Sequence, residues 1–185
     1  MCVKNSEEPI EWFALSAPYR NELKAKALLD EQGVENYLPM QHKIVTDKKG
    51  KKVRKLMPVV SNLLFARTTR THLQEIKTGV HYLQYRTRVV NGRNVPIVVP
   101  DYQMKQFIAV CDTRNEQLIF LTPQEINLSK GTPVRVIGGM FDGVEGLFLK
   151  VKGVRSRRVV VQVDGIAVAT AEIEPQYIEV IQSSK

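Results

Sequence analysis

The stretch that decides the fold of the C-terminal part is KGTPVRVIGGMFDGVEG, residues 130–146 of a 185-residue chain. Val134 and Val136 alternate with polar neighbours, as in a half-buried strand, and the glycines mark a turn and the start of a second strand. Similar period-two runs follow at 147–151, 159–163 and 166–168. Asp164-Gly165 is a two-residue hairpin signal between the last two runs. About four or five short strands without a helix predict a small β-barrel.

Upstream of this stretch, segments with strand patterns alternate with segments with helix patterns. The expected strands are Glu11–Ala17, Tyr37–Val45, Met57–Ala66 and Val80–Arg86. The expected helices run from Glu22 to about Gln32 behind an Asn21 N-cap, from a Thr71/Gln74 capping box to Gly79, and onward from an Asp101 cap. The order β-α-β-β-α-β-α predicts an antiparallel sheet with helices packed on it, and therefore an α+β protein.

Charge divides the chain into two parts. Residues 1–110 contain 18 Lys and Arg against 10 Asp and Glu, whereas residues 111–185 contain nine of each, so the whole net charge of +8 lies in the N-terminal part. Such asymmetry predicts two modules, of which only the first works close to a polyanion. The predicted domains are 9–115 and 129–182, joined by a linker at 116–128.

The residues that could carry catalysis show no catalytic pattern. His42, His72 and His81 lack metal-ligand spacing, and the sequence contains no phosphate loop, dinucleotide fingerprint or nucleophile elbow. We therefore expect no enzyme, no catalytic residue, no cofactor and no metal site. An enzyme would require a convergent polar cluster, for example at His42 or His81.

The chain also lacks the usual signs of export or membrane insertion. No apolar run approaches the roughly 18 residues of a membrane-spanning helix, and the N-terminus has no apolar signal region. Two cysteines, Cys2 and Cys111, cannot form a disulfide framework. Cys111 falls on the apolar stripe of the last predicted helix, so we expect it to be buried. These features predict a cytoplasmic protein.

The densest charge lies in KIVTDKKGKKVRK, residues 43–55, with seven cations and one acid. Because this segment lies between two predicted strands, we expect a hairpin tip that attracts phosphates in a salt-dependent way. The alternative is a solvated tip that protects a sheet edge. The candidate nucleic-acid contacts are Lys48, Lys49, Lys51, Lys52, Arg54 and Lys55. No aromatic residue is interleaved with them, which argues against a stacking platform for single strands. A second basic tip is expected at 155–158, with a solvated turn as its alternative.

Residues 130–146 resemble the KOW motif, in which glycines allow a tight barrel corner and a phenylalanine packs into it. The motif residues are Gly131, Val134, Val136, Gly139, Phe141, Gly143 and Gly146. In the N-terminal part, WFAL at 12–15, VENYLP at 34–39, PVVSNLLFAR at 58–67 and VPIVVPD at 95–101 resemble the NGN domain of NusG-like transcription elongation factors. The resemblance extends from about residue 10 to residue 182 and is strongest to the UpxY-type paralogues, which are associated with capsular polysaccharide operons. It implies an NGN domain followed by an SH3-like KOW barrel.

The resemblance further implies a non-enzymatic elongation and antitermination factor that binds RNA polymerase. In the family, an apolar patch of the NGN domain docks on the clamp helices of the largest subunit, and a second contact reaches the gate loop. The residues that match the patch are Trp12, Phe13, Leu63 and Phe65. The residues that match the gate-loop contact are Thr68, Thr69, Arg70 and Thr71. A place in the sheet core is the alternative for Leu63 and Phe65, and a helix cap is the alternative for Thr71.

The resemblance also implies a second protein partner for the KOW domain, such as a ribosomal protein or a termination factor. The neutral charge of that domain favours a protein over RNA. The basic hairpin would then lie near upstream or non-template DNA. The rival interpretation is a KOW-type RNA-binding or ribosome-associated protein, which would bind naked RNA without polymerase.

Overall fold

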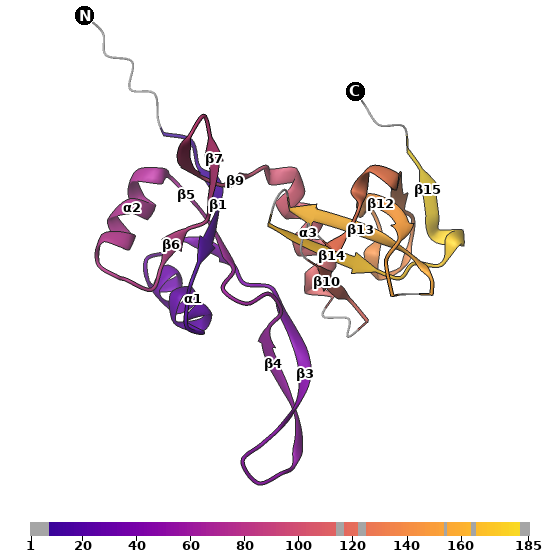
Figure 1. The fold of residues 1–185 in the computed structure, drawn as a ribbon, viewed down its shortest axis with the longest axis horizontal. Helices are drawn as coiled ribbons and strands as arrows, with labels where there is room; N and C mark the ends of the chain where they lie inside the picture. Colours follow the sequence, from indigo (N-terminus) through magenta and orange to yellow (C-terminus); the bar gives the residue numbers. More distant parts are fainter. Residues whose placement is uncertain (1–7, 114–116, 122–124, 154, 164–165, 182–185) are drawn as a thin grey trace, which may run out of the picture. The chain divides into compact units, whose positions relative to one another are not determined.

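The structure is a computed structural model that describes residues 8–113, 117–121, 125–153, 155–163 and 166–181 (Figure 1). The chain divides into two compact units: unit 1 is Met1–Leu38 with Ser61–Asp101, and unit 2 is Pro39–Val60 with Tyr102–Lys185. Antiparallel sheets and helices together confirm the predicted α+β class. The domain limits expected from the sequence stay a prediction.

Unit 1 is built on a central strand, β1 (Glu11–Ser16). On one side β1 pairs antiparallel with β5 (Leu64–Thr68), and β5 pairs in turn with the edge strand β2 (Glu35–Tyr37). On the other side, β6 (Gln84–Tyr85) and β9 (Val98–Val99) pair with different parts of β1. The four central residues of β1 are all buried, as is typical of a strand covered on both faces.

The first helix of unit 1, α1 (Glu22–Glu31), agrees closely with its predicted range. Asn21 occupies the N-cap position, but its side-chain amide donates to the Pro18 carbonyl (2.7 Å) and makes no cap. At the other end, Gly33 has the positive φ of +66° that a glycine after a helix commonly adopts. The limits of this helix therefore agree with the prediction. The capping role predicted for the Asn21 side chain is wrong.

The second helix of unit 1, α2 (Arg70–Thr78), begins earlier than the sequence suggested. Thr69 is the N-cap, because its Oγ1 accepts a hydrogen bond from the His72 N–H (3.2 Å). The predicted Thr71/Gln74 capping box is therefore wrong. Both residues lie inside the helix.

Several predicted strands are shorter than expected. The segment Tyr37–Val45 contains two strands, with β2 ending at its first residue and a new strand beginning at Met40. The segment Met57–Ala66 is also divided, because Asn62 has a φ of +60°, in the left-handed region that a strand excludes. Only β6 remains of the strand expected at Val80–Arg86.

A separate hairpin in unit 1 joins β7 (Thr87–Val90) to β8 (Arg93–Pro96). Its turn residues, Asn91 and Gly92, both have positive φ, at +49° and +75°. This is the backbone geometry that favours an Asn-Gly dipeptide in a two-residue hairpin. The turn predicted at this dipeptide is confirmed.

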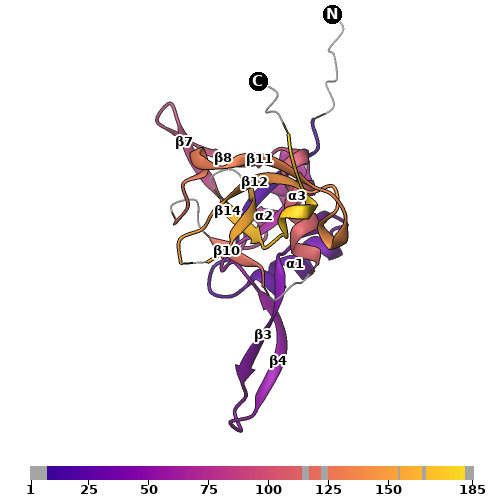
Figure 2. The ribbon, with the colours of Figure 1, turned by 90° about the vertical axis from the view of Figure 1, so that its right-hand side faces the viewer.

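Unit 2 contains a long hairpin of β3 (Met40–Thr46) and β4 (Lys52–Pro58), which Figure 2 shows as a twisted two-stranded ribbon. The hairpin expected around residues 43–55 is thus confirmed. Most of that segment is paired strand, however, and only residues 47–51 form the turn.

Helix α3 (Asp101–Asp112) begins at the residue expected to cap it. Its predicted apolar stripe is buried at Met104, Phe107 and Cys111 and half-buried at Ile108. Cys111 is therefore the small buried residue that the stripe predicted. Within the described ranges, no helix combines the length and the apolar character needed to cross a membrane.

Six strands of unit 2 form one antiparallel sheet in the order β10-β14-β13-β12-β11-β15. Their bounds are β10 (Ile119–Leu121), β11 (Thr132–Val136), β12 (Glu145–Lys150), β13 (Arg157–Val163), β14 (Ala167–Ala171) and β15 (Ile178–Val180). Leu149, Val151, Val160 and Val168 form a buried cluster within this sheet. The sheet agrees with the predicted β-rich C-terminal module and has more strands than the four or five expected, because β10 lies in the segment expected to be a linker. Asp164-Gly165 lies outside the described residues.

The KOW-like stretch forms the corner between β11 and β12. Phe141 is buried there, as the motif implies. A Cβ atom on Gly146 would lie 2.5 Å from the Val160 carbonyl oxygen, and one on Gly131 would lie 2.7 Å from Leu147 Cβ. Because both distances are shorter than van der Waals contact, a side chain at either position would force its neighbours to shift.

Candidate functional site

Of the four residues expected to form an apolar patch, Trp12 and Phe13 lie on β1, Phe65 lies on β5 and Leu63 directly precedes β5, but all four are buried. The relative exposures of Trp12, Phe13, Leu63 and Phe65 are 5%, 1%, 0% and 0%. The Phe13 ring lies 5.6 Å from the Tyr85 ring in a tilted arrangement that packs two aromatic side chains of the sheet. In this structure the four residues are sheet core and present no exposed patch.

The turn before β5 is held by a polar network that the sequence did not reveal. The Asn62 N–H donates to the buried Glu22 carboxylate (2.7 Å), and the Asn62 side-chain oxygen accepts from the Ser16 hydroxyl (2.7 Å). The Asn62 carbonyl accepts from the Arg86 guanidinium (2.9 Å), and burial lowers the pKa of that guanidinium. Asparagine tolerates positive φ better than most residues do, so Asn62 was the one residue in the sequence that could have indicated this turn.

The residues expected to contact a gate loop lie at the end of β5 and the start of α2, and their exposures differ. Thr68 is buried and its hydroxyl lies 3.1 Å from His72 Nδ1, while Thr69 caps the helix. Arg70 and Thr71 are exposed. Two of the four residues are therefore occupied by local structure, and the other two are accessible to a partner.

A carboxylate from the N-terminal segment also binds the start of α2. The Thr71 N–H donates to both oxygens of Glu8, at 3.1 and 3.2 Å. Hydrogen bonding from the Thr71 side chain is the largest cause that holds the pKa of the Glu8 carboxyl below its ordinary value of 4.5. An acid at this position is also favoured by the partial positive charge of a helix N-terminus. Together, Glu8, Arg70 and Thr71 line a shallow cleft of about 430 Å³.

The turn of the basic hairpin is ordered by its single acid. Asp47 Oδ1 accepts hydrogen bonds from the backbone N–H groups of Lys49 (2.8 Å) and Lys51 (2.9 Å). Farther along the strands, Lys43 lies directly opposite Lys55, and like charges in that position are destabilising. The acid is thus used to shape the turn rather than to form an ion pair with the cations around it.

All six candidate nucleic-acid contacts on this hairpin are exposed. Within the part of the chain that the structure describes, no ion pair is formed by the five lysines of the set, Lys48, Lys49, Lys51, Lys52 and Lys55. An ordered turn that carries unneutralised cations is suited to bind phosphates without reading sequence.

The second basic segment, 155–158, differs from the exposed tip expected there. Arg158 is only 2% exposed, and burial lowers the pKa of its guanidinium. It donates to Thr170 Oγ1 (2.8 Å), to the carbonyl oxygens of Thr170 and Gln117, and to Glu172 (3.3 Å). Arg158 is therefore a structural residue that ties the segment before β10 to β14, and the prediction of a tip is wrong for it.

The described residues contain no cluster of three or more His, Cys, Asp or Glu side chains that could hold a metal ion. His42 and His81, the positions where a polar cluster would have indicated an enzyme, are half-buried and exposed, respectively. Two exposed polar surfaces coincide with residues that the sequence singled out, one at the start of α2 and one on the basic hairpin.

Residues 10–108 match the family model described as "Transcription termination factor nusG". The chain belongs to the NusG family. Proteins of this family are transcription factors and not enzymes, so this NusG-family chain is assigned to transcription. No curated protein matches it. A solved structure described as "Domain interaction in Thermotoga maritima NusG" is similar over 94% of this chain and 98% of that chain, with 17% sequence identity and a TM-score of 0.42.

Proposed function

We propose that this protein is a specialised elongation and antitermination factor that binds RNA polymerase in the cytoplasm and suppresses pausing and termination. The observation that carries the proposal is the family match over residues 10–108, a range that includes every strand and helix of unit 1. The clamp of RNA polymerase has an open and a closed state. A factor that binds the closed state better than the open one shifts the polymerase population toward the closed state. That state resists the conformations that permit pausing and release.

The polymerase contact is proposed for unit 1, with the buried patch residues acting as its scaffold. Leu63 and Phe65 are both buried, so they anchor the start of β5 in the core. The accessible part of the same region contains Ile10, Arg70 and Thr71. We assign the gate-loop contact to Arg70 and Thr71, and the clamp-helix contact to the region supported by β1 and β5.

The test of this proposal is a pull-down of core RNA polymerase and of an elongation complex by the full chain. A photo-crosslinker placed at Ile10 or Thr71 should link to the polymerase, whereas one at Tyr177 in unit 2 should not. A chain that binds neither polymerase form would contradict the proposal.

A Leu63→Ala/Phe65→Ala variant in the same pull-down tests whether these buried residues support the polymerase contact. Truncation of a buried Leu or Phe costs about 2–5 kcal/mol, so its circular dichroism melt must be measured alongside binding. Loss of binding with an intact fold would place the contact on β5 itself. Loss of both would agree with the scaffold role.

The basic hairpin is proposed to contact upstream or non-template DNA beside the polymerase. Its support is the set of exposed, unneutralised lysines at the turn. Glutamine at Lys48 and Lys51 should lower the slope of log K against log salt by up to about 1.8 on duplex DNA. The matched control removes the same charge from the β7–β8 hairpin, at Arg88 and Arg93, and should leave the slope unchanged. Equal slopes in all three proteins would exclude the hairpin contact.

Two finer proposals concern specialisation and unit 2. The sequence resemblance to UpxY-type paralogues supports a role at polysaccharide biosynthesis operons, which read-through assays on templates with and without such a leader would test. The KOW-like sheet would recruit a second protein, a ribosomal protein or a termination factor. The rival function, a KOW-type RNA-binding or ribosome-associated protein, predicts tight binding of naked RNA with no need for polymerase, so the absence of polymerase binding is the result that would favour it.

A further inference from the structure

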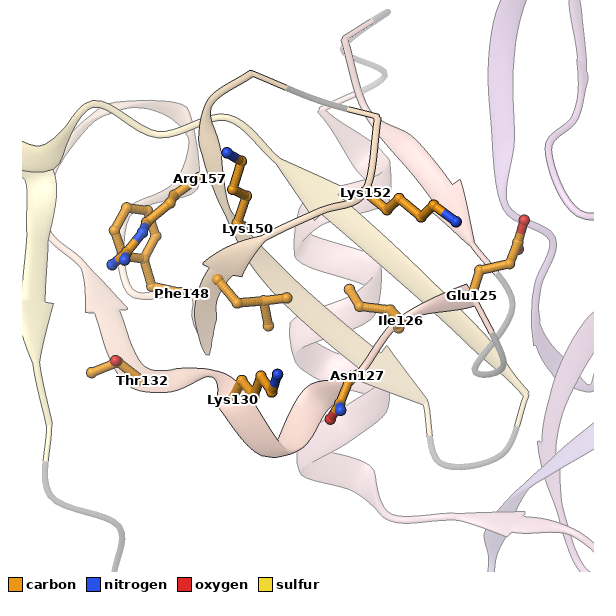
Figure 3. Close-up of a pocket in the computed structure, with 10 residues that line it drawn as sticks. Glu125, Ile126, Asn127, Lys130, Thr132, Phe148, Lys150, Lys152 and Arg157 are labelled. Carbon is orange, nitrogen blue, oxygen red and sulfur yellow. The ribbon is translucent and has the colours of Figure 1, made fainter.

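A cleft in unit 2 is lined mainly by positively charged side chains, although the C-terminal part of the chain is neutral overall. The cleft has a volume of about 500 Å³ and lies between the segment before β11 and strands β12 and β13 (Figure 3). Four cations line it, namely Lys130, Lys150, Lys152 and Arg157, together with one acid, Glu125. The cleft therefore has a positive balance although residues 111–185 as a whole have none.

The four cations are exposed and lack acidic partners. Within the described residues, none of them forms an ion pair, whereas Arg135 on the same sheet pairs with Glu145 (2.7 Å) and Glu179 (3.9 Å). Glu145 and Glu179 of this sheet therefore neutralise Arg135 and not the cations of the cleft. The positive charge of the cleft is therefore not neutralised by ion pairs within the described residues.

Two of the cations are placed at a cost to the sheet. Lys150 on β12 lies directly opposite Arg157 on β13 in the antiparallel register. Like charges in this position repel and destabilise strand pairing, and a bound anion between them would remove that repulsion. The Arg157 guanidinium contacts the Phe148 ring, but within the described residues no ion pair neutralises either cation, so an anion bound between them would relieve the repulsion.

An aromatic ring lies within this row of cations. Phe148 is half-buried and lines the cleft two residues before Lys150, and the Arg157 guanidinium carbon is 5.9 Å from its ring centroid. Asn127 and Thr132 add an amide and a hydroxyl to the lining (Figure 3). Cations that follow a backbone, with an aromatic ring for stacking, are the combination that binds single-stranded nucleic acid.

We propose that this cleft binds single-stranded nucleic acid, with phosphates on the cations and a base on Phe148. Its volume is within the range of small-ligand pockets, which suits an unstacked nucleotide and not a duplex with enclosed bases. An acidic protein segment would form ion pairs with the cations, but it would have no base to stack on the Phe148 ring. The inference does not depend on polymerase binding, and it revises the expectation that the KOW-like domain prefers a protein partner.

The test is fluorescence anisotropy of a labelled 12-nucleotide oligouridylate with the full chain. To separate the cleft from the basic hairpin, all proteins carry glutamine at the three turn lysines, 48, 49 and 51, and at Lys52, the first residue of β4. A Lys150→Gln/Arg157→Gln variant should weaken RNA binding and lower the slope of log K against log salt by about 1.4. Arg135→Gln removes a charge outside the cleft and should change neither quantity. Deoxyoligonucleotides in a parallel series show whether RNA is distinguished from DNA.

Two further variants test the stacking position and the sign of the electrostatics. Phe148→Leu should weaken binding by about fivefold or more, whereas Tyr177→Leu, which changes an aromatic residue in the short helical turn before β15, should not. Glu125→Gln should strengthen binding, because it removes the acid that repels phosphate. The melting temperature of the Lys150→Gln/Arg157→Gln variant should be unchanged or higher, since the repulsion is gone.

Four results would overturn the proposal. They are an unchanged affinity in the Lys150→Gln/Arg157→Gln variant, an equal loss in Arg135→Gln, a lowered melting temperature that reveals a structural role for the two cations, and a polyglutamate peptide that competes as well as RNA and loses binding in the same variants. The last result would identify an acidic protein as the occupant.

Discussion

Substitution of Gly146 by alanine gives a quantitative test of how closely β12 and β13 pack at the KOW-like corner. The added Cβ would lie 2.5 Å from the Val160 carbonyl oxygen and 3.1 Å from Val159 Cγ1. Ordinary contact begins near 3.4 Å, so the two strands must separate by roughly 0.9 Å. The obstacle is backbone, which cannot rotate away as a side chain can.

The magnitude follows from two opposing contributions. Overpacking of this kind costs about 1–3 kcal/mol, and the upper end applies because a ladder of hydrogen bonds must deform. Replacing glycine by alanine also restricts the unfolded chain, which returns about 0.4–1 kcal/mol. We expect a net loss of about 2 kcal/mol, or a fall in melting midpoint of roughly 8–16 °C for a domain of this size.

The assay is thermal and urea unfolding followed by far-UV circular dichroism, with Trp12 fluorescence as a separate signal from unit 1. Gly79→Ala is the matched control, since its nearest neighbour would be 3.8 Å away and it should be neutral or slightly stabilising. A Gly146→Ala midpoint equal to that of Gly79→Ala would refute the close approach of the two strands.

Three further predictions concern the polar contacts. Glu22→Ala removes the acceptor of the Asn62 N–H and should cost about 1–3 kcal/mol in urea unfolding, whereas Glu22→Gln keeps an oxygen there and should cost less. Arg158→Met removes the guanidinium that donates to the hydroxyl and carbonyl oxygens of the buried Thr170 and should also cost about 1–3 kcal/mol; an unchanged urea midpoint would show that water replaces the guanidinium. Glu8 stabilises the folded state in its charged form, because its folded pKa lies below 4.5. Its contribution is complete above that value and is lost as the pH falls through the folded pKa. Glu8→Gln should therefore lower stability at pH 7 and make no difference at pH 2, as measured by melts across that range, and an equal effect at both pH values would show that the charge is irrelevant.

The sequence predicted local structure best where a short-range rule applies. The turn at Asn91-Gly92 and the glycine after α1 follow from backbone conformations that other residues avoid, and the valine alternation after Gly131 predicted the C-terminal sheet. Errors arose where a distant residue takes part. Asn62 breaks a long apolar run because Ser16, Glu22 and Arg86 hold it in a turn, and none of these lies near it in the chain.

Sequence alone determined the α+β class, the NusG resemblance and the basic hairpin, because each depends on residue types in consecutive positions. Only the tertiary structure decided which side chains remain exposed. Strand periodicity assigns a residue to a face but does not say whether that face is covered, so Leu63 and Phe65 proved to be core and Arg158 proved to be buried. Strand register, which depends on pairing between distant segments, placed Lys150 opposite Arg157 and so concentrated charge that the composition shows as neutral.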